Sequence, residues 1–112
     1  MATKADIDVE TLRATQAFIA KISEQYDLME VILFGSRTHR VDSDADVAVI
    51  LRGSIGLRDD VAVNMAGIAF DILMETGVLI CPLPLWEGEW EHPEKFNNPE
   101  LIKIIQREGV SL

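Results

Sequence analysis

The sequence predicts an α+β (α/β) domain in which helices pack on a small mixed sheet. Apolar residues recur every three or four positions in two long segments, which is the spacing of one face of a helix. Short β-branched runs that end at glycine or polar turns lie between these segments, as expected of buried strands. The resulting order is helix, strand, turn, strand, helix, strand and helix, and such an order favours helices packed against one sheet.

The first half of the chain contains one predicted helix and two predicted strands. An apolar stripe over residues 9–26 predicts the helix, and Asp6 or Asp8 could cap its start. Residues 30–34 and 45–51 are short and rich in β-branched residues, so both are predicted to be buried strands separated by a polar turn. The helical stripe consists of Val9, Leu12, Thr15, Ile19, Ile22 and Tyr26, and Phe18 widens it.

The second half contains two further helices and a third strand. A helix is predicted over residues 57–75, with Gly77 as its C-terminal stop. Residues 78–85 are predicted to form a strand, and its two prolines suit the edge of a sheet because each removes a backbone donor. The last helix begins after the cap Asn98 and stops at Gly109. The buried side of the long helix is predicted to comprise Val61, Met65, Ile68, Ala69, Ile72 and Leu73.

Length and composition fit one domain spanning residues 1–112, with 48% apolar residues and a core large enough to fold alone. The net charge is −9 and acids outnumber bases in both halves, which argues against a generic nucleic-acid binder. The longest apolar run has nine residues, whereas a membrane span needs about 20. The single cysteine, Cys81, excludes an intrachain disulfide, and the start of the chain lacks an apolar signal core, so we expect a cytoplasmic location.

The turn between the first two predicted strands carries the residues best suited to chemistry. Asp44 and Asp46 are two apart at the head of a strand and therefore face the same side. A divalent cation would neutralise their mutual repulsion, and their hard oxygen atoms suit Mg²⁺. Gly35 would let backbone N–H groups approach a phosphate, while Ser36 adds a hydroxyl and Arg37 a guanidinium. A cation beside a phosphate cradle is the arrangement of phosphoryl or nucleotidyl transfer.

These residues resemble a known signature. Gly35-Ser36-Arg37, followed by Asp42-Ser43-Asp44-Ala45-Asp46-Val47 at the head of a strand, resembles the motif of the minimal nucleotidyltransferases, which belong to the DNA polymerase beta-like nucleotidyltransferase superfamily. The resemblance covers nearly the whole chain, including residues 71–80 and 90–94. It implies a nucleotidyltransferase fold that uses ATP, with Asp44 and Asp46 as catalytic residues and Mg²⁺ ligands, and with Gly35, Ser36 and Arg37 binding the nucleotide.

The resemblance also implies a partner. Members of this size are commonly encoded beside a HEPN-domain protein, and the pair acts as a toxin–antitoxin system in which the HEPN protein is an RNase toxin. The nucleotidyltransferase is the antitoxin, which blocks the toxin by binding and, in some systems, by transferring AMP to a tyrosine near its active site. The implied function is therefore Mg²⁺-dependent transfer of AMP from ATP to a HEPN tyrosine, with no direct nucleic-acid or membrane partner.

Two departures from the family pattern leave alternatives open. Only seven residues, 37–43, separate Gly-Ser from Asp-x-Asp, and this turn is shorter than the family usually has. The strand predicted over 78–85 contains no Asp or Glu, so no residue matches the third carboxylate of a two-metal site. One alternative is a catalytically weak or inactive antitoxin of this fold that neutralises its HEPN partner by binding alone. A small-molecule nucleotidyltransferase is disfavoured, because 112 residues leave no second domain to enclose a substrate.

Several other residues have simpler structural interpretations. His39 and Arg40 are expected at the surface, with a substrate-binding role as the lesser alternative. Cys81 is expected to be a buried small hydrophobe. Residues 86–94 hold four acids and two tryptophans, and two interpretations stay open for them: a loop whose tryptophans cover the core, or a surface that binds a partner.

Overall fold

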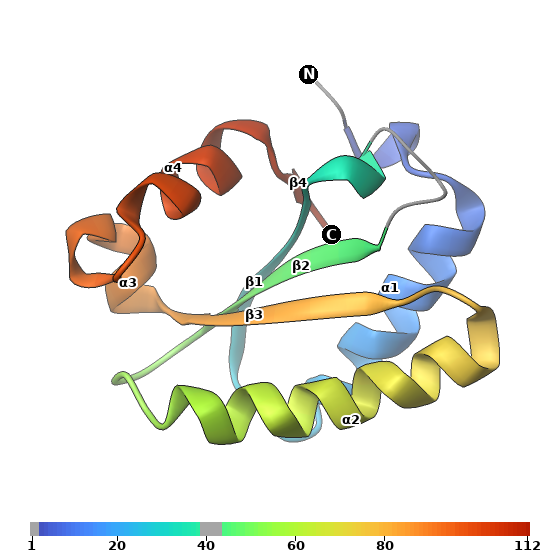
Figure 1. The fold of residues 1–112 in the computed structure, drawn as a ribbon, viewed down its shortest axis with the longest axis horizontal. Helices are drawn as coiled ribbons and strands as arrows, with labels where there is room; N and C mark the ends of the chain where they lie inside the picture. Colours follow the sequence, from blue (N-terminus) through green and yellow to red (C-terminus); the bar gives the residue numbers. More distant parts are fainter. Residues whose placement is uncertain (1–2, 39–43) are drawn as a thin grey trace.

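The structure is a computed structural model that describes residues 3–38 and 44–112, and within them four strands form one mixed sheet in the order β3-β2-β1-β4 (Figure 1). β1 runs antiparallel to both β2 and β4, whereas β2 and β3 are parallel. The predicted mixed sheet is therefore confirmed. The strands are β1 (Leu28–Phe34), β2 (Ala45–Leu51), β3 (Ile80–Trp86) and β4 (Val110–Ser111).

Helices cover both faces of this sheet. Alternate residues of β2 lie in two separate apolar clusters: Val47 and Val49 pack with α1 and α2, while Ala48 and Ile50 pack with α3 and α4. Figure 1 shows α2 and α4 on opposite sides of the strands. In the described ranges the helices are α1 (Val9–Ile22), α2 (Arg58–Thr76), α3 (Glu87–Glu91) and α4 (Pro99–Glu108), and the short 3₁₀ turns are η1 (Lys4–Asp6), η2 (Ser36–Thr38) and η3 (Pro93–Lys95).

The predicted start of the first helix, end of the long helix and start of the last helix are confirmed. The Asp8 carboxylate accepts the Thr11 backbone N–H at 3.1 Å and caps α1. Gly77 ends α2 with a φ of 78°, in the left-handed region that glycine adopts without strain. The Asn98 side chain accepts the Leu101 N–H at 3.3 Å and caps α4. Each of these ends depends on a signal within a few residues, so the sequence was sufficient to place it.

The predicted apolar stripe of the first helix is partly wrong. Val9 is 62% exposed, and α1 ends at Ile22, so Tyr26 lies beyond it. The buried side instead centres on Phe18 and includes two threonines, because their hydroxyl groups find partners: Thr15 Oγ1 donates to the Thr11 carbonyl at 2.8 Å. The buried residues are Thr11, Ala14, Thr15, Phe18 and Ile22.

β3 lies at the edge of the sheet, as its prolines predicted. In a strand, the N–H and C=O of one residue point to the same side. Leu79 O accepts the Ala45 N–H at 2.8 Å, so odd-numbered residues face β2, and Pro82 and Pro84 face outward. The Pro84 carbonyl accepts Arg58 NH1 at 2.8 Å. The outer edge of β3 therefore offers no donor at either proline.

Besides the 3₁₀ turns, the described residues form one helix and one strand that were not predicted from the sequence. Residues assigned to an acidic stretch after β3 form the short helix α3, and the chain end adds β4 beside β1. Among the described residues, no helix is long and apolar enough to cross a membrane.

Candidate functional site

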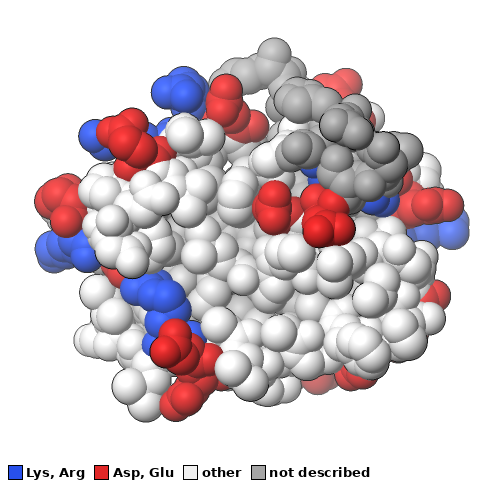
Figure 2. Space-filling model, in the orientation of Figure 1, with Lys and Arg blue, Asp and Glu red and all other residues white. Residues whose placement is uncertain are grey.

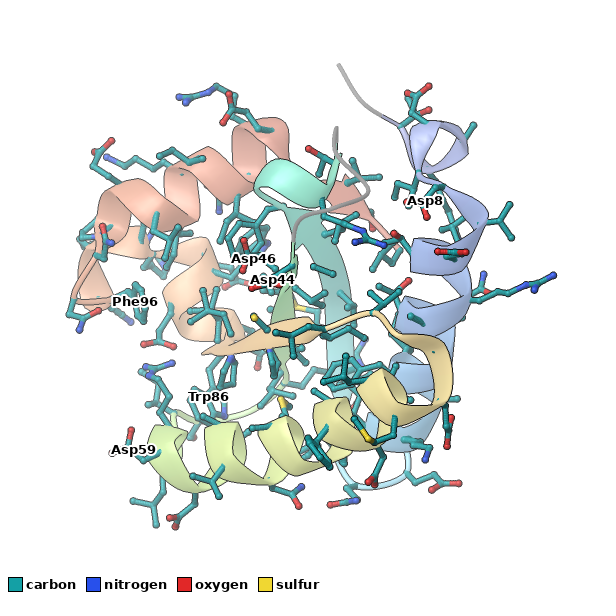
Figure 3. The ribbon with its side chains drawn as sticks, turned by 45° about the vertical axis from the view of Figure 1, so that its right-hand side comes forward. Asp8, Asp44, Asp46, Asp59, Trp86 and Phe96 are labelled. Carbon is teal, nitrogen blue, oxygen red and sulfur yellow. The ribbon has the colours of Figure 1, made fainter. Side chains whose placement is uncertain are left out.

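The residues predicted to bind the metal and the nucleotide lie at one end of the sheet, where β1 ends and β2 begins. Phe34, the last residue of β1, pairs with Asp46 of β2, and Gly35 follows directly. Asp44 precedes β2, and Figure 3 shows its side chain beside that of Asp46. Strand alternation places Asp46 on the sheet face that α3 and α4 cover. The structure thus brings together the two aspartates and the glycine turn that the sequence singled out.

Asp46 is a carboxylate in an otherwise apolar strand. Every residue of β2 is buried apart from Asp46, which is half-buried, whereas Asp44 is exposed. Burial raises the pKa of Asp46, and the negative charge of Asp44 raises it further. Within residues 3–38 and 44–112, no hydrogen bond or ion pair reaches either carboxylate. Two neighbouring anions without a compensating partner are the donor set that a hard divalent cation would stabilise.

Position 35 requires a glycine because the backbone there lies against the carboxylate of Asp46. Its φ is 76°, and a Cβ built there would lie 2.7 Å from Asp46 Oδ2, closer than such atoms approach. The turn that follows is held by Thr38, whose N–H and hydroxyl donate to the Gly35 carbonyl at 3.3 and 2.8 Å. Ser36 begins this turn as the first residue of η2. The backbone at Gly35 therefore passes close to the carboxylate because it carries no side chain.

Arg37, predicted to bind the nucleotide, is engaged with the start of α1. Its side chain is only 8% exposed, and its Nε donates to Thr11 Oγ1 at 2.7 Å. Its NH2 lies 4.0 Å from Asp8 Oδ2, and Thr11 Oγ1 in turn donates to Asp8. Burial alone would raise the pKa of Asp8, but the Thr11 hydrogen bonds and the Arg37 charge outweigh it and lower that pKa. Arg37 thus ties the turn to α1, and phosphate binding by Arg37 stays a prediction.

Cys81 occupies the position beside Asp46 on the neighbouring strand. The two residues pair in the register of β2 and β3, and Cys81 is half-buried rather than buried as predicted. Burial raises the pKa of the Cys81 thiol, and the charges of Asp44 and Asp46 raise it further. The sequence did not reveal this neighbour, because a parallel register is set by long-range packing.

The donor set can be compared with the metal sites that it would need to form. In the described part of the chain, no three His, Cys, Asp or Glu side chains come together as a metal-binding group. Two carboxylates fit a single Mg²⁺ that keeps open positions for water and phosphate oxygens, which is how this cation is usually held. They do not form a three-carboxylate site. His39, Arg40 and the Asp42 and Ser43 part of the motif lie outside the described residues.

The acidic and aromatic residues 86–94 belong to the packing of the domain. Trp86 is buried, and Trp90 packs against the apolar cluster under α4, which agrees with the core-covering interpretation. Glu89 is only 2% exposed and forms a two-pronged ion pair with Arg58, including NH1 to Oε1 at 3.1 Å. The Arg58 guanidinium also lies 5.1 Å from the Trp86 ring centre and 5.0 Å from that of Phe96.

Comparisons with known proteins support the fold. No family model matches the sequence, and no curated protein gives a significant match. Among solved structures, the chain is similar to a protein from Sulfolobus solfataricus described as "a putative nucleotidyltransferase". The identity is 17% and the TM-score 0.51, with 80% of this chain and 77% of the other covered. At this identity the likeness shows the fold alone, so the chain has the fold of a nucleotidyltransferase structure.

Proposed function

We propose that this protein is an Mg²⁺-dependent nucleotidyltransferase that transfers AMP from ATP to a tyrosine of a HEPN-domain partner and acts as the antitoxin of the pair. The observation that carries the proposal is the pair of carboxylates on Asp44 and Asp46. They lie side by side at the end of the sheet, without a compensating partner among the described residues, and Gly35 adjoins them. The nucleotidyltransferase-type fold supports this interpretation.

Each residue has a role that follows from its position. Asp44 and Asp46 would hold Mg²⁺, which when bound stabilises negative charge on the phosphate oxygens of ATP. Gly35 keeps the backbone close to Asp46, and its backbone N–H would bind a phosphate oxygen of ATP. Arg37 fixes the turn on α1 through Thr11, so that the turn is held before substrate binds.

The transfer itself joins the tyrosine oxygen to the α-phosphorus of ATP and releases pyrophosphate. Among the described residues, Cys81 rather than a third carboxylate lies beside Asp46. No third acid is therefore available there to take the phenolic proton, and the proton passes to solvent. Slow turnover is the expected consequence.

The position of Cys81 beside Asp46, where no third carboxylate lies among the described residues, favours a second candidate function. A nucleotidyltransferase-fold antitoxin with weak or absent catalysis would neutralise its partner by binding alone. Such a protein would tolerate the replacement of the third carboxylate by Cys81, because binding needs no catalytic acid.

One experiment separates the two. The protein is incubated with Mg²⁺, ATP labelled at the α-phosphate and the product of the adjacent gene, using wild type and an Asp44→Asn, Asp46→Asn double variant. Label on the partner with wild type only supports the transferase. Neutralisation of the partner by both proteins without label supports the binding antitoxin. If the wild-type protein neither labels the partner nor forms a complex with it, both candidate functions are contradicted.

A further inference from the structure

α2 is apolar on the side that faces solvent as well as on the side that faces the sheet. Met65, Ala69 and Ile72 are buried under it. On the opposite side, Val63, Phe70 and Met74 are 73%, 57% and 66% exposed. Their spacing of seven and four places them on one stripe, with the exposed Ala66 and Gly67 between them. We call these five residues the α2 stripe. A surface helix ordinarily carries polar residues on this side.

Gly67 lies in the middle of the α2 stripe, although glycine is among the poorest helix formers. A Cβ built at Gly67 meets no atom within 4 Å, so packing within the described chain does not require a glycine there. A missing side chain on an exposed helix face lets another backbone approach closely. The α2 stripe therefore has the shape that a second helix crossing at Gly67 would fill.

The margins of the α2 stripe are acidic. Asp59 and Asp60 lie in the first turn of α2, and Asp71 and Glu75 lie near its end. Lys21 of α1 approaches Glu75 at 3.6 Å. Figure 2 shows an uncharged surface over β3 and α2 with charged side chains at its margins. A second copy of this chain, also at −9, would set acid against acid, and an anionic membrane would be repelled. A basic protein surface is complementary.

We propose that the α2 stripe docks a helix of a partner protein, one with an apolar ridge flanked by Lys or Arg. The identity of the partner rests on the proposed function, whereas the surface rests on the exposure, the glycine and the charges of α2. α2 ends at Thr76, and β3 begins at Ile80 beside Ala45, so the Met74 end of the stripe lies at the end of the sheet that carries Asp46. α2 covers the face of the sheet opposite to that of Asp46, so a helix docked on the stripe would hold its protein on the far side of the sheet, at the same end as the candidate site.

The test is a titration of the adjacent gene product against wild type, Gly67→Leu, Val63→Ser and Val9→Ser. Val9 is an exposed valine on α1, so Val9→Ser makes the same change outside the stripe. Gly67→Leu should raise the melting temperature, because leucine favours helix and has free space, yet weaken the complex by ~10-fold or more. Val63→Ser should weaken it by ~5-fold, and Val9→Ser by less than ~2-fold.

The outcomes distinguish this inference from the proposed function. If Gly67→Leu and Val63→Ser bind the adjacent gene product as tightly as wild type does, the docking role of the α2 stripe is overturned and the proposed antitoxin function still stands. Absence of any wild-type complex would contradict the proposed partner. A second experiment then tests whether the α2 stripe binds a basic amphipathic helix. In it, two amphipathic helical peptides with the same Leu and Ala ridge, flanked by Lys or by Glu, are titrated by fluorescence anisotropy.

If the wild-type protein binds the Lys peptide but not the Glu peptide, and Gly67→Leu loses this binding, the α2 stripe is supported as a docking surface. If the wild-type protein binds neither peptide, the docking surface is overturned. Sedimentation of the protein by itself provides the last check. Self-association of wild type that Gly67→Leu abolishes would identify a second copy as the occupant and overturn the heterologous partner.

Discussion

A single methyl group at Gly35 should test the geometry of the candidate site. In a Gly35→Ala variant the new Cβ would lie 2.7 Å from Asp46 Oδ2, so the carboxylate must turn away from its present position. Alanine must also adopt the φ of 76° that the turn needs. The change therefore has two separable effects, one on the backbone and one on Asp46.

The size of each effect can be worked out from the structure. Alanine in the left-handed region costs about 1–2 kcal/mol, and displacing the Asp46 side chain from its rotamer adds about 0.5–1.5 kcal/mol. Gly77 provides a matched control, because its φ is 78° and a Cβ there meets nothing within 4 Å. Any loss of unfolded-state freedom applies equally to both alanines and cancels in the comparison. Gly35→Ala should therefore be less stable than Gly77→Ala by about 0.5–1.5 kcal/mol.

Urea denaturation of wild type, both single variants and the Gly35→Ala, Asp46→Ala double variant measures these free energies of unfolding. In the Asp46→Ala background the excess cost of Gly35→Ala should disappear. Thermal shift with Mn²⁺ and ATP should be reduced in Gly35→Ala and unchanged in Gly77→Ala. Equal free energies and equal Mn²⁺ responses for the two alanine variants would refute the idea that Gly35 exists to accommodate Asp46.

Three further predictions concern the charged residues. Asp46→Asn should stabilise the fold at pH 7 by less than about 1 kcal/mol, since solvent screens this half-exposed group. The raised pKa of Asp46 means that wild type recovers this stability as the pH falls towards the ordinary carboxyl value of 3.8, so the gain in Asp46→Asn should shrink in thermal melts at low pH. Arg58→Met should cost about 2–4 kcal/mol in urea denaturation, because it leaves Glu89 buried without its cation, and Glu89→Gln should cost less. Cys81→Asp should tighten Mn²⁺ binding measured by calorimetry, because a third carboxylate would then lie beside Asp46.

Each of these three predictions would be contradicted by a specific result. A loss of stability in Asp46→Asn at pH 7 would show that the ionised carboxylate has a stabilising partner in solution. An Arg58→Met protein as stable as wild type would mean that Glu89 does not need the Arg58 cation in order to stay buried. Unchanged Mn²⁺ affinity in Cys81→Asp would place the cation away from β3.

The features that the sequence predicted correctly depend on near neighbours. The strand over residues 45–51 follows from its run of β-branched apolar residues, and the caps at Asp8 and Asn98 follow from capping side chains within three residues. The proximity of Asp46 to the Gly35 turn also follows, because the two strands are joined by a short connection. Local patterns were sufficient wherever one strand or one helix end carries the whole signal.

The features that the sequence missed depend on distant contacts. Arg37 donates to the hydroxyl of Thr11, which is 26 residues earlier and was not part of the predicted apolar stripe. The pairing of Cys81 with Asp46 depends on where α2 returns the chain to the sheet. The burial of Glu89 depends on Arg58, 31 residues earlier. An acid in an acidic stretch gives no sign of such a partner.

The prolines of β3 have a consequence for how this protein can be recognised. Its sheet ends on one side at a strand with proline at two successive outward positions, and on the other side at β4, which has two residues. Neither edge can be extended readily by another strand, so crowded copies have no simple route to stacking into fibres. A protein that binds at either edge of the sheet must therefore recognise side chains rather than add a strand, and single substitutions there can change which protein binds without changing the sheet.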